Sequence, residues 1–131
     1  MADESILIVD DNLTNLKLTR LLLEQERYNV RTATDAEAAL EILKTFQPRL
    51  ILMDIQLPGI DGLELTRRLK SNSATQQITI LALTAYAMKK DERKVAEAGC
   101  DGFIAKPIDT RSLGRILAEH LRRGTKMAAR P

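Results

Sequence analysis

The sequence predicts an α/β fold in which a parallel β-sheet is covered by helices on both faces. Five short apolar runs alternate with helical stretches along the chain, and this alternation is typical of successive strand–helix units. Four of the runs are dominated by consecutive aliphatic residues, as strands buried on both faces of a sheet require. The predicted strands are Ile6 to Val9, Asn29 to Ala33, Leu50 to Met53, Ile78 to Leu83, and Phe103 to Ala105.

The second predicted strand differs from the others because Asn29, Arg31 and Thr32 make it polar, so we expect it at an edge of the sheet. Thr34 and Glu37 have the spacing of a capping box at the start of the second helix. The residues expected to face the core are Leu18, Leu21 and Leu22 in the first helix, Ala36, Ala39, Leu40 and Leu43 in the second, Leu65 and Leu69 in the third, Val95 and Ala96 in the fourth, and Leu113, Ile116, Leu117 and Leu121 in the fifth.

Length and composition indicate one domain. The chain has 131 residues, of which 44% are hydrophobic and 29% are charged. No apolar run approaches the ~20 residues that span a bilayer, and the N-terminus lacks the basic start of a secretory signal, so we expect a cytoplasmic protein. The single cysteine, Cys100, excludes an internal disulfide. A net charge of +2 and 3% aromatic residues give no indication of nucleic-acid binding.

Polar residues follow four of the predicted strands. They are Asp10 and Asp11, Asp54, Thr84, and Lys106 with Pro107. Parallel strands bring these ends to one edge of the sheet, where ligands bind in open α/β folds.

Three carboxylates gathered at one edge would repel each other unless a cation compensates them. Mg²⁺ prefers a few carboxylate oxygens, retained waters and a phosphate ligand. The Lys106 ammonium and the Thr84 hydroxyl are suited to phosphoryl oxygens. The pattern therefore predicts Mg²⁺-dependent transfer of a phosphoryl group onto a carboxylate, a reaction that needs no general base.

Each of these residues also has a plainer interpretation. Asp10 and Asp11 could cap the first helix or form an Asx turn before it. Thr84 could cap the fourth helix, and Lys106 could be an ordinary solvated lysine. Phe103, as an aromatic residue on a strand, could simply belong to the core. The site interpretation depends on the aspartates, Thr84 and Lys106 all standing directly after neighbouring strands of the same sheet.

The chain resembles the receiver domains of bacterial-type two-component response regulators from Ile6 to about Leu121. The resemblance implies a doubly wound five-stranded parallel sheet of order 2-1-3-4-5, the flavodoxin-like receiver fold. It also implies that residues 1–123 form the receiver domain, followed by a flexible tail at 124–131. The segments that carry the resemblance are Ile-Leu-Ile-Val-Asp10-Asp11-Asn12, Leu-Ile-Leu-Met-Asp54-Ile-Gln-Leu-Pro58-Gly59-Ile-Asp61-Gly62, Leu-Thr84-Ala85, and Phe103-Ile-Ala-Lys106-Pro107.

The resemblance implies a role for each matching residue. Asp54 would accept the phosphoryl group, with Thr84 and Lys106 as the other catalytic residues. The Mg²⁺ ligands would be Asp11 and Asp54, Asp10 through a water, and the backbone carbonyl of Gln56. The phosphoryl oxygens would be held by Thr84, the Ala85 amide and Lys106. Thr84 and Phe103 would form the switch, Gln56 and Tyr86 would tune the lifetime of the phosphorylated state, and the bond before Pro107 would be cis.

The implied function is a step in a phosphorelay. Asp54 would receive its phosphoryl group from a phosphohistidine of a histidine kinase or phosphotransfer protein, which would dock around Leu13, Leu16 and Lys17. The face made by the fourth helix, fifth strand and fifth helix would bind a downstream protein. Neither direct nucleic-acid binding nor membrane insertion is expected, and the protein would be a monomer or a phosphorylation-dependent dimer. Beyond its own phosphotransfer and slow autodephosphorylation, it would not be an enzyme.

Within the family, the sequence around Asn12, Asn15 and Tyr86 resembles two groups: stand-alone regulators of the cell-division and polarity type, and receivers of hybrid histidine kinases. Three other classes of protein require features that this sequence lacks. A haloacid dehalogenase-type phosphatase needs a second aspartate where Gln56 stands. A flavodoxin-like carrier would need a phosphate loop and aromatic residues, and a nucleotide-binding domain would need a glycine-rich loop after the first strand.

Overall fold

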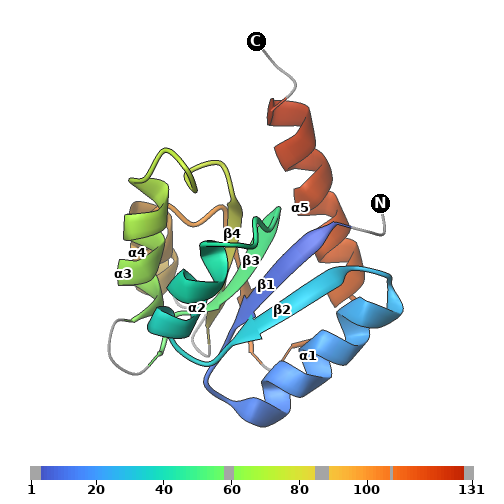
Figure 1. Cartoon of the computed structure of the whole chain (residues 1–131). Helices are drawn as coiled ribbons and strands as arrows, with labels where there is room; N and C mark the ends of the chain where they lie inside the picture. The colour runs from blue at the N-terminus through green and yellow to red at the C-terminus, as the bar shows by residue number, and fades with distance from the viewer. Residues whose placement is uncertain (1–3, 58–60, 85–88, 107, 129–131) are drawn as a thin grey trace.

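A five-stranded parallel sheet runs through the middle of the molecule, with helices on both sides (Figure 1). The computed structural model describes residues 4–57, 61–84, 89–106 and 108–128. The strand order is β2-β1-β3-β4-β5, which confirms the predicted doubly wound fold. The strands are β1 (Ser5–Val9), β2 (Asn29–Ala33), β3 (Leu50–Asp54), β4 (Thr79–Thr84) and β5 (Gly102–Ala105), and the helices are α1 (Leu13–Gln25), α2 (Ala36–Leu43), α3 (Gly62–Lys70), α4 (Lys89–Ala98) and α5 (Leu113–Ala128).

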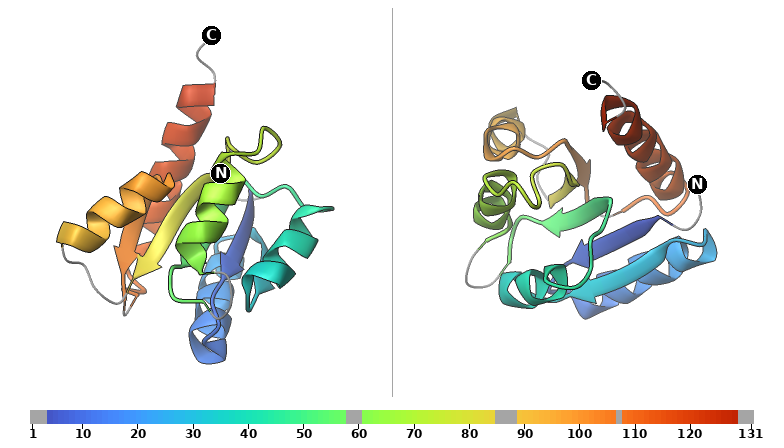
Figure 2. Two further views of the ribbon diagram at one scale, coloured as in Figure 1. Left: turned by 90° about the vertical axis from the view of Figure 1, so that its left-hand side faces the viewer. Right: turned by 45° about the horizontal axis from the view of Figure 1, so that its top comes forward.

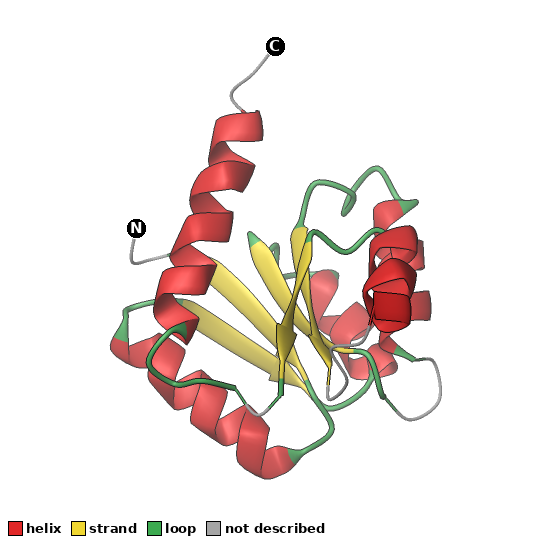
Figure 3. Ribbon diagram, turned by 180° about the vertical axis from the view of Figure 1, so that it is seen from behind, coloured by secondary structure: helices red, strands yellow, loops and turns green. Residues whose placement is uncertain are grey.

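Alternate residues of the central strands face two separate hydrophobic clusters. Ile6 and Ile8 of β1 pack with α1 and α5 on one face. Leu7 and Val9 point to the opposite face and pack with α2 and α3. Figures 2 and 3 show these two helical layers from other directions. Because both faces are covered, the central strands must be apolar at every position, which is the pattern that the sequence displays.

The predicted edge position of β2 is confirmed. Strand β2 pairs only with β1 among the strands described, in the register Ser5↔Asn29 to Val9↔Ala33. Asn29 and Arg31 are exposed on this strand, whereas Val30 and Ala33 are buried. Polar side chains are tolerated there because an edge strand has one open side.

The predicted inner face of α1 is largely wrong. Leu18 and Leu21 are 47% and 50% exposed, and Leu22 is only partly buried. The residues that face the core are Leu16, Thr19 and Leu23. The 13-residue helix contains six leucines, so several stripes have helical spacing and the pattern alone does not select one of them.

The other helices agree better with the sequence. In α2, Ala36 and Ala39 are buried, while Leu40 and Leu43 are partly buried against the same cluster. In α3, Leu65 and Leu69 are buried as predicted. In α5, Leu113, Leu117 and Leu121 are buried and Ile116 is partly buried. In α4, Val95 is buried as predicted, but Ala98 is buried in place of Ala96.

The predicted start of the second helix is wrong, and the fifth helix reaches into the segment expected to be a tail. Helix α2 is capped by Asp35, whose side chain accepts a hydrogen bond from the Ala38 N–H at 2.7 Å, so Thr34 is not the cap. Aspartate is as good a cap as threonine and stands next to the helix. Helix α5 continues through Gly124 to Ala128, because one glycine costs a helix only about 1 kcal/mol. Its last turns extend beyond the sheet (Figure 1).

Within the described parts of the chain, no helix is both long enough and apolar enough to span a bilayer.

Candidate functional site

Three aspartates meet at the carboxyl edge of the sheet. Asp10 directly follows β1, and Asp54 is the last residue of β3, which is the neighbouring strand. One carboxylate oxygen from each of Asp10, Asp11 and Asp54 lies within 4.8 Å of the others. Asp10 and Asp54 are 1% and 3% exposed, whereas Asp11 is open to solvent. The cluster is therefore a partly buried acidic site with one side that a ligand can approach.

Lys106 supplies positive charge to this cluster. Its Nζ lies 3.1 Å from Asp54 Oδ2 and 3.6 Å from Asp10 Oδ2, and its side chain is 20% exposed. Its backbone N–H donates to the Thr84 carbonyl at 2.7 Å, which joins the ends of β4 and β5. The interpretation of Lys106 as an ordinary solvated lysine is therefore wrong.

Backbone N–H groups hold the two buried carboxylates in position. The Asn12 N–H donates to Asp10 Oδ1 at 2.9 Å, and the Gln56 N–H donates to Asp54 Oδ1 at 2.9 Å. Asp10 thus forms the Asx turn that its plainer interpretation predicted. The same side chain also belongs to the acidic cluster, so the two interpretations do not exclude each other. The cap of α1 is Asn12, whose side chain accepts from the Asn15 N–H, so neither Asp10 nor Asp11 is the cap.

Gly62 allows α3 to begin directly beneath the site. A Cβ atom at this position would collide with the backbone carbonyl oxygen of Asp54 and lie 2.7 Å from Ile55 Cα. The Gly62 N–H donates to the Ile55 carbonyl at 3.3 Å. Glycine is therefore needed for the close approach between the start of α3 and the end of β3.

Burial raises the pKa of the Asp10 carboxyl above its ordinary value of 3.8. The hydrogen bond from Asn12 and the charge of Lys106 lower this pKa, while the nearby carboxylate of Asp54 raises it further. The net increase means that the folded protein resists ionisation of Asp10.

The donor set fits a hard divalent cation. Three carboxylates and one ammonium leave two negative charges in excess when all are ionised. Carboxylate oxygens on a partly open surface suit Mg²⁺, which retains several of its waters. Asp10, Asp11 and Asp54 are the residues that could hold such an ion.

The structure describes some of the remaining predicted site residues and not others. Thr84 is the last residue of β4, is 3% exposed and lies next to Lys106 at the site edge. Phe103 on β5 is 38% exposed, so its interpretation as a plain core residue is wrong. Gln56 is exposed beside Asp54. Ala85, Tyr86 and Pro107 lie outside the described residues.

The sequence reasoning missed two residues that shape the site. Asn12 supplies both the cap of α1 and the N–H bound by Asp10, and Gly62 lets α3 pack against Asp54. Both stand inside the segments that carried the family resemblance, but no role was assigned to them. Two features of the sequence could have indicated them. One is an asparagine, a common helix cap, directly after Asp10 and Asp11, and the other is a glycine after Asp61 at the start of a helix.

A doubly wound α/β sheet with an acidic cluster and a lysine at its carboxyl edge defines a class of phosphate- and metal-binding signalling domains. The model of the response regulator receiver domain matches residues 6–118. The chain belongs to this family, whose members act as signalling modules of two-component systems. This membership decides against the phosphatase, flavodoxin and nucleotide-binding alternatives.

Two curated relatives are polar-differentiation response regulators named DivK. The protein from Brucella anthropi is 43% identical over 105 residues, which cover 80% of this chain and 85% of the relative. The protein from Brucella ovis is 45% identical over 106 residues, with the same coverage. The chain is therefore DivK-like in sequence.

Solved structures agree with the fold and the family. A receiver domain protein from Methanospirillum hungatei matches with a TM-score of 0.88 and 31% identity over 96% of this chain and 99% of that one. The receiver domain of a sensor histidine kinase from Pseudomonas aeruginosa matches with a TM-score of 0.83 and 32% identity, covering 92% of this chain and 98% of that one. That domain has a magnesium ion coordinated in its active-site cleft.

We expect the Asp10→Asn variant to be more stable than the parent at pH 7 in a buffer without divalent cations. The pKa of Asp10 is higher in the folded protein than its ordinary value of 3.8. The free energy of unfolding therefore decreases as the pH rises from below 3.8 through the folded-state pKa. Asparagine removes this pH dependence and keeps an acceptor for the Asn12 N–H. We expect a gain of about 1 kcal/mol in the free energy of unfolding, measured with urea and EDTA.

Asp11→Asn is the matched control, because Asp11 is exposed at the same site. Its unfolding free energy should change by no more than about 0.5 kcal/mol. Unfolding of Asp10→Asn at lower urea concentrations than the parent would contradict the prediction.

Proposed function

We propose that Asp54 accepts a phosphoryl group from a phosphohistidine and that this event switches a protein-binding face of the receiver domain. The observation that carries the proposal is the placement of Asp54 at the end of β3, between two further carboxylates and the Lys106 ammonium. Family membership and a TM-score of 0.83 to a receiver with a magnesium ion in its cleft also support it.

The proposed reaction is a direct displacement at phosphorus. A carboxylate oxygen of Asp54 forms the new O–P bond while the N–P bond of the phosphohistidine breaks, and the imidazole leaves with its electron pair and takes up a proton. Lys106 Nζ already lies 3.1 Å from Asp54 Oδ2, so a small movement would let it contact a phosphoryl oxygen on Asp54. The Thr84 hydroxyl and the Ala85 amide are proposed to bind the other phosphoryl oxygens.

We propose Asp11, Asp54 and the Gln56 carbonyl as direct ligands of Mg²⁺, with Asp10 acting mainly through a water. When bound, the cation would neutralise charge on the phosphoryl group during transfer. The protein's own part is to hold Asp54 through the Gln56 N–H and to keep the excess negative charge in place. Because the proposed reaction stores phosphate instead of releasing it rapidly, only slow autodephosphorylation is expected.

A surface for the phosphodonor lies beside the site on α1. Leu13, at the first position of α1, is 69% exposed and stands two residues after Asp11. With Thr14, Lys17, Leu18 and Leu21 it lines a shallow apolar surface. Leu16, which the sequence reasoning placed here, is buried and does not contribute. We propose that a histidine kinase or phosphotransfer protein docks on this surface, because exposed leucines grouped on one helix suit a helical partner.

The proposed output surface is formed by α4, β5 and α5. Phe103 lies on β5 in this surface and is 38% exposed, so its side chain has an outward position from which it could turn inward. Thr84 would couple to it by moving toward the phosphoryl group. A downstream protein, or a second phosphorylated copy, would bind the changed surface.

Incubation with acetyl phosphate tests the central proposal. The parent should gain one phosphoryl group in the presence of Mg²⁺ and none with EDTA, as measured by the mass of the intact protein. Asp54→Asn should gain none. Asp35→Asn, which makes the same change at the partly buried cap of α2 and keeps the Ala38 bond, should label like the parent. Label on Asp54→Asn equal to that of the parent would overturn the proposal.

Gln56 and Tyr86 lie two residues after Asp54 and Thr84, and we propose that both tune the lifetime of the phosphorylated state. The same labelled protein tests the role of Tyr86. We propose that Tyr86 shields the acyl phosphate from water. After removal of free acetyl phosphate, the label should decay faster on Tyr86→Ala than on the parent. Equal or slower decay would contradict this role.

The donor surface is tested by comparing two phosphodonors. Leu13→Ala should slow phosphorylation by a phosphorylated histidine phosphotransfer protein about tenfold, because an exposed contact near the site is lost. It should leave labelling by acetyl phosphate unchanged. Leu21→Ala, about 12 Å further along α1 at 1.5 Å per residue, should have a smaller effect. Slower labelling by both donors would show a fault in the site and not in docking.

A further inference from the structure

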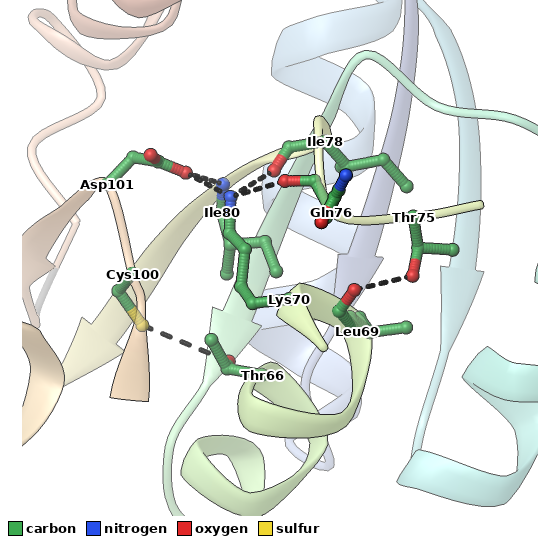
Figure 4. A network of polar contacts seen from close by, with 9 residues as sticks. All are labelled: Thr66, Leu69, Lys70, Thr75, Gln76, Ile78, Ile80, Cys100 and Asp101. Carbon is green, nitrogen blue, oxygen red and sulfur yellow. Dashed lines mark hydrogen bonds and ion pairs between the residues drawn. The ribbon is translucent and has the colours of Figure 1, made fainter. Parts of the chain in front are cut away.

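A network of polar contacts lies at the amino ends of β4 and β5 (Figure 4). Asp54 stands at the carboxyl end of β3, so the network is at the opposite end of the parallel strands from the site. It joins the end of α3, the loop before β4 and the turn between α4 and β5. None of its members takes part in the proposed phosphotransfer. The proposed phosphotransfer therefore does not account for this network.

Lys70, the last residue of α3, lies at the centre of this network. Its Nζ donates to the Ile78 carbonyl at 2.7 Å, to Asp101 Oδ2 at 2.9 Å and to the Gln76 carbonyl at 3.3 Å. The side chain is only 20% exposed. An ammonium group has three donors, and all three are used here. Lys70 thus ties two segments of the chain, the loop before β4 and the turn before β5, to α3.

Asp101 completes the link to the sheet. Besides Lys70, its Oδ2 accepts from the Ile80 N–H at 2.8 Å, and its own N–H donates to the Ile80 carbonyl at 2.8 Å. These two bonds lie just before the first β4–β5 pair, Leu81↔Gly102. The Asp101 carboxylate thereby holds the start of β5 against β4, and Lys70 compensates its charge.

The carboxyl end of α4 is attached directly to this cluster. Gly99 ends the helix with φ +101°, and the N–H groups of Gly99 and Cys100 donate to the carbonyls of Ala96 and Val95. A Cβ atom at Gly99 would lie 3.0 Å from Lys70 Cγ, so the lysine stem packs against this turn. Cys100 Sγ also lies 3.8 Å from Thr66 Oγ1 in the middle of α3.

The two ends of α4 differ in the residue types that they carry. Among its described side chains, 93–98, the buried ones are Val95 and Ala98, both in the last four residues. The first four residues of the helix, Lys89, Lys90, Asp91 and Glu92, are all charged in sequence.

We propose that Lys70 and Asp101 form a clamp that fixes the carboxyl end of α4, so that α4 pivots at Gly99 and its amino end moves. The clamp is defined as these two side chains with the backbone groups of Gln76, Ile78 and Ile80. Its role in signalling rests on the proposed phosphorylation of Asp54, whereas its anchoring of α4 does not.

Helix α3 connects the clamp to the site. It begins at Gly62, packed against the Asp54 carbonyl, and ends at Lys70. The Thr66 hydroxyl donates to the Gly62 carbonyl within it at 2.8 Å. The fixed point of α4 is therefore held in a defined position relative to Asp54. A change at the carboxyl edge can then displace the amino end of α4 while its other end stays in place.

Amide hydrogen exchange of the unphosphorylated full chain, followed by NMR, tests the anchor. In Lys70→Met, which keeps the apolar stem beside Gly99, the amides of Ile80, Cys100 and Asp101 should exchange about tenfold faster than in the parent, because charge-assisted bonds are lost. The amide of Leu52 in β3 should change less than about twofold. Asp101→Asn keeps an acceptor for the Ile80 N–H and should give a smaller increase of the same kind.

Lys44→Met is the matched control. Lys44 forms an exposed ion pair with Glu41 at 3.0 Å on α2, away from the clamp, so the three amides should behave as in the parent. Exchange at Ile80, Cys100 and Asp101 that is the same in Lys70→Met as in Lys44→Met would overturn the clamp.

The pivot is tested in the resting parent and its Lys70→Met variant. In the parent, amides near Ala98 should exchange at least about tenfold more slowly than those near Asp91, and this difference should disappear in Lys70→Met. Uniform exchange along α4 in the parent would overturn the pivot. Beryllofluoride, a mimic of the acyl phosphate, should alter only the amino half of α4. A loss of this last response alone, with the resting difference intact, would count against phosphorylation at Asp54 and not against the anchor.

Discussion

The structure depends on the burial of two carboxylates beside one lysine. Asp10 and Asp54 are almost completely removed from water, which would be costly for isolated charges. The Lys106 ammonium and two backbone N–H groups offset part of this cost. These groups come from β1, β3 and β5 or from the residues after them, so the carboxyl ends of these strands must be aligned. Strand β4 lies between β3 and β5, and the long lysine side chain crosses that distance.

The same arrangement leaves the site short of positive charge. Folding raises the pKa of Asp10, mainly because the carboxyl is buried and to a smaller extent because Asp54 lies nearby, so its ionised form destabilises the folded state. Such a deficit favours a divalent cation, which brings the charge distribution closer to balance and can then compensate an added phosphoryl group. It also makes the state of Asp54 matter to its neighbours, because Lys106 is bound to that carboxylate in the resting protein. A change of charge at Asp54 therefore alters the contact made by Lys106, the residue that follows β5.

The two edges of the sheet have different tasks. At the carboxyl edge, loops after the strands bring together the charged groups of the site, and ligands can approach Asp11 from solvent. At the amino edge, Lys70 and Asp101 connect α3, β4 and β5 through an exposed ion pair and through two bonds to the backbone that are partly buried. Helix α3 spans the two edges, and α4 is attached at the amino edge. A rigid end and a responsive end are what a switch needs if it is to move one helix without disturbing the core.

The sequence by itself determined the fold class and pointed to the three aspartates and the lysine that the structure brings together. Continuous aliphatic runs are required where strands are buried on both faces, and polar residues such as Asp54 and Thr84 stand where those runs end, so both features can be seen without coordinates. Tertiary structure alone decided which face of α1 is buried, because its six leucines allow several stripes and only packing against the sheet selects Leu16 and Leu23. It also decided the Lys70–Asp101 contact between residues 31 positions apart, since no local spacing relates two side chains that meet only when α3 and β5 pack against the same strand.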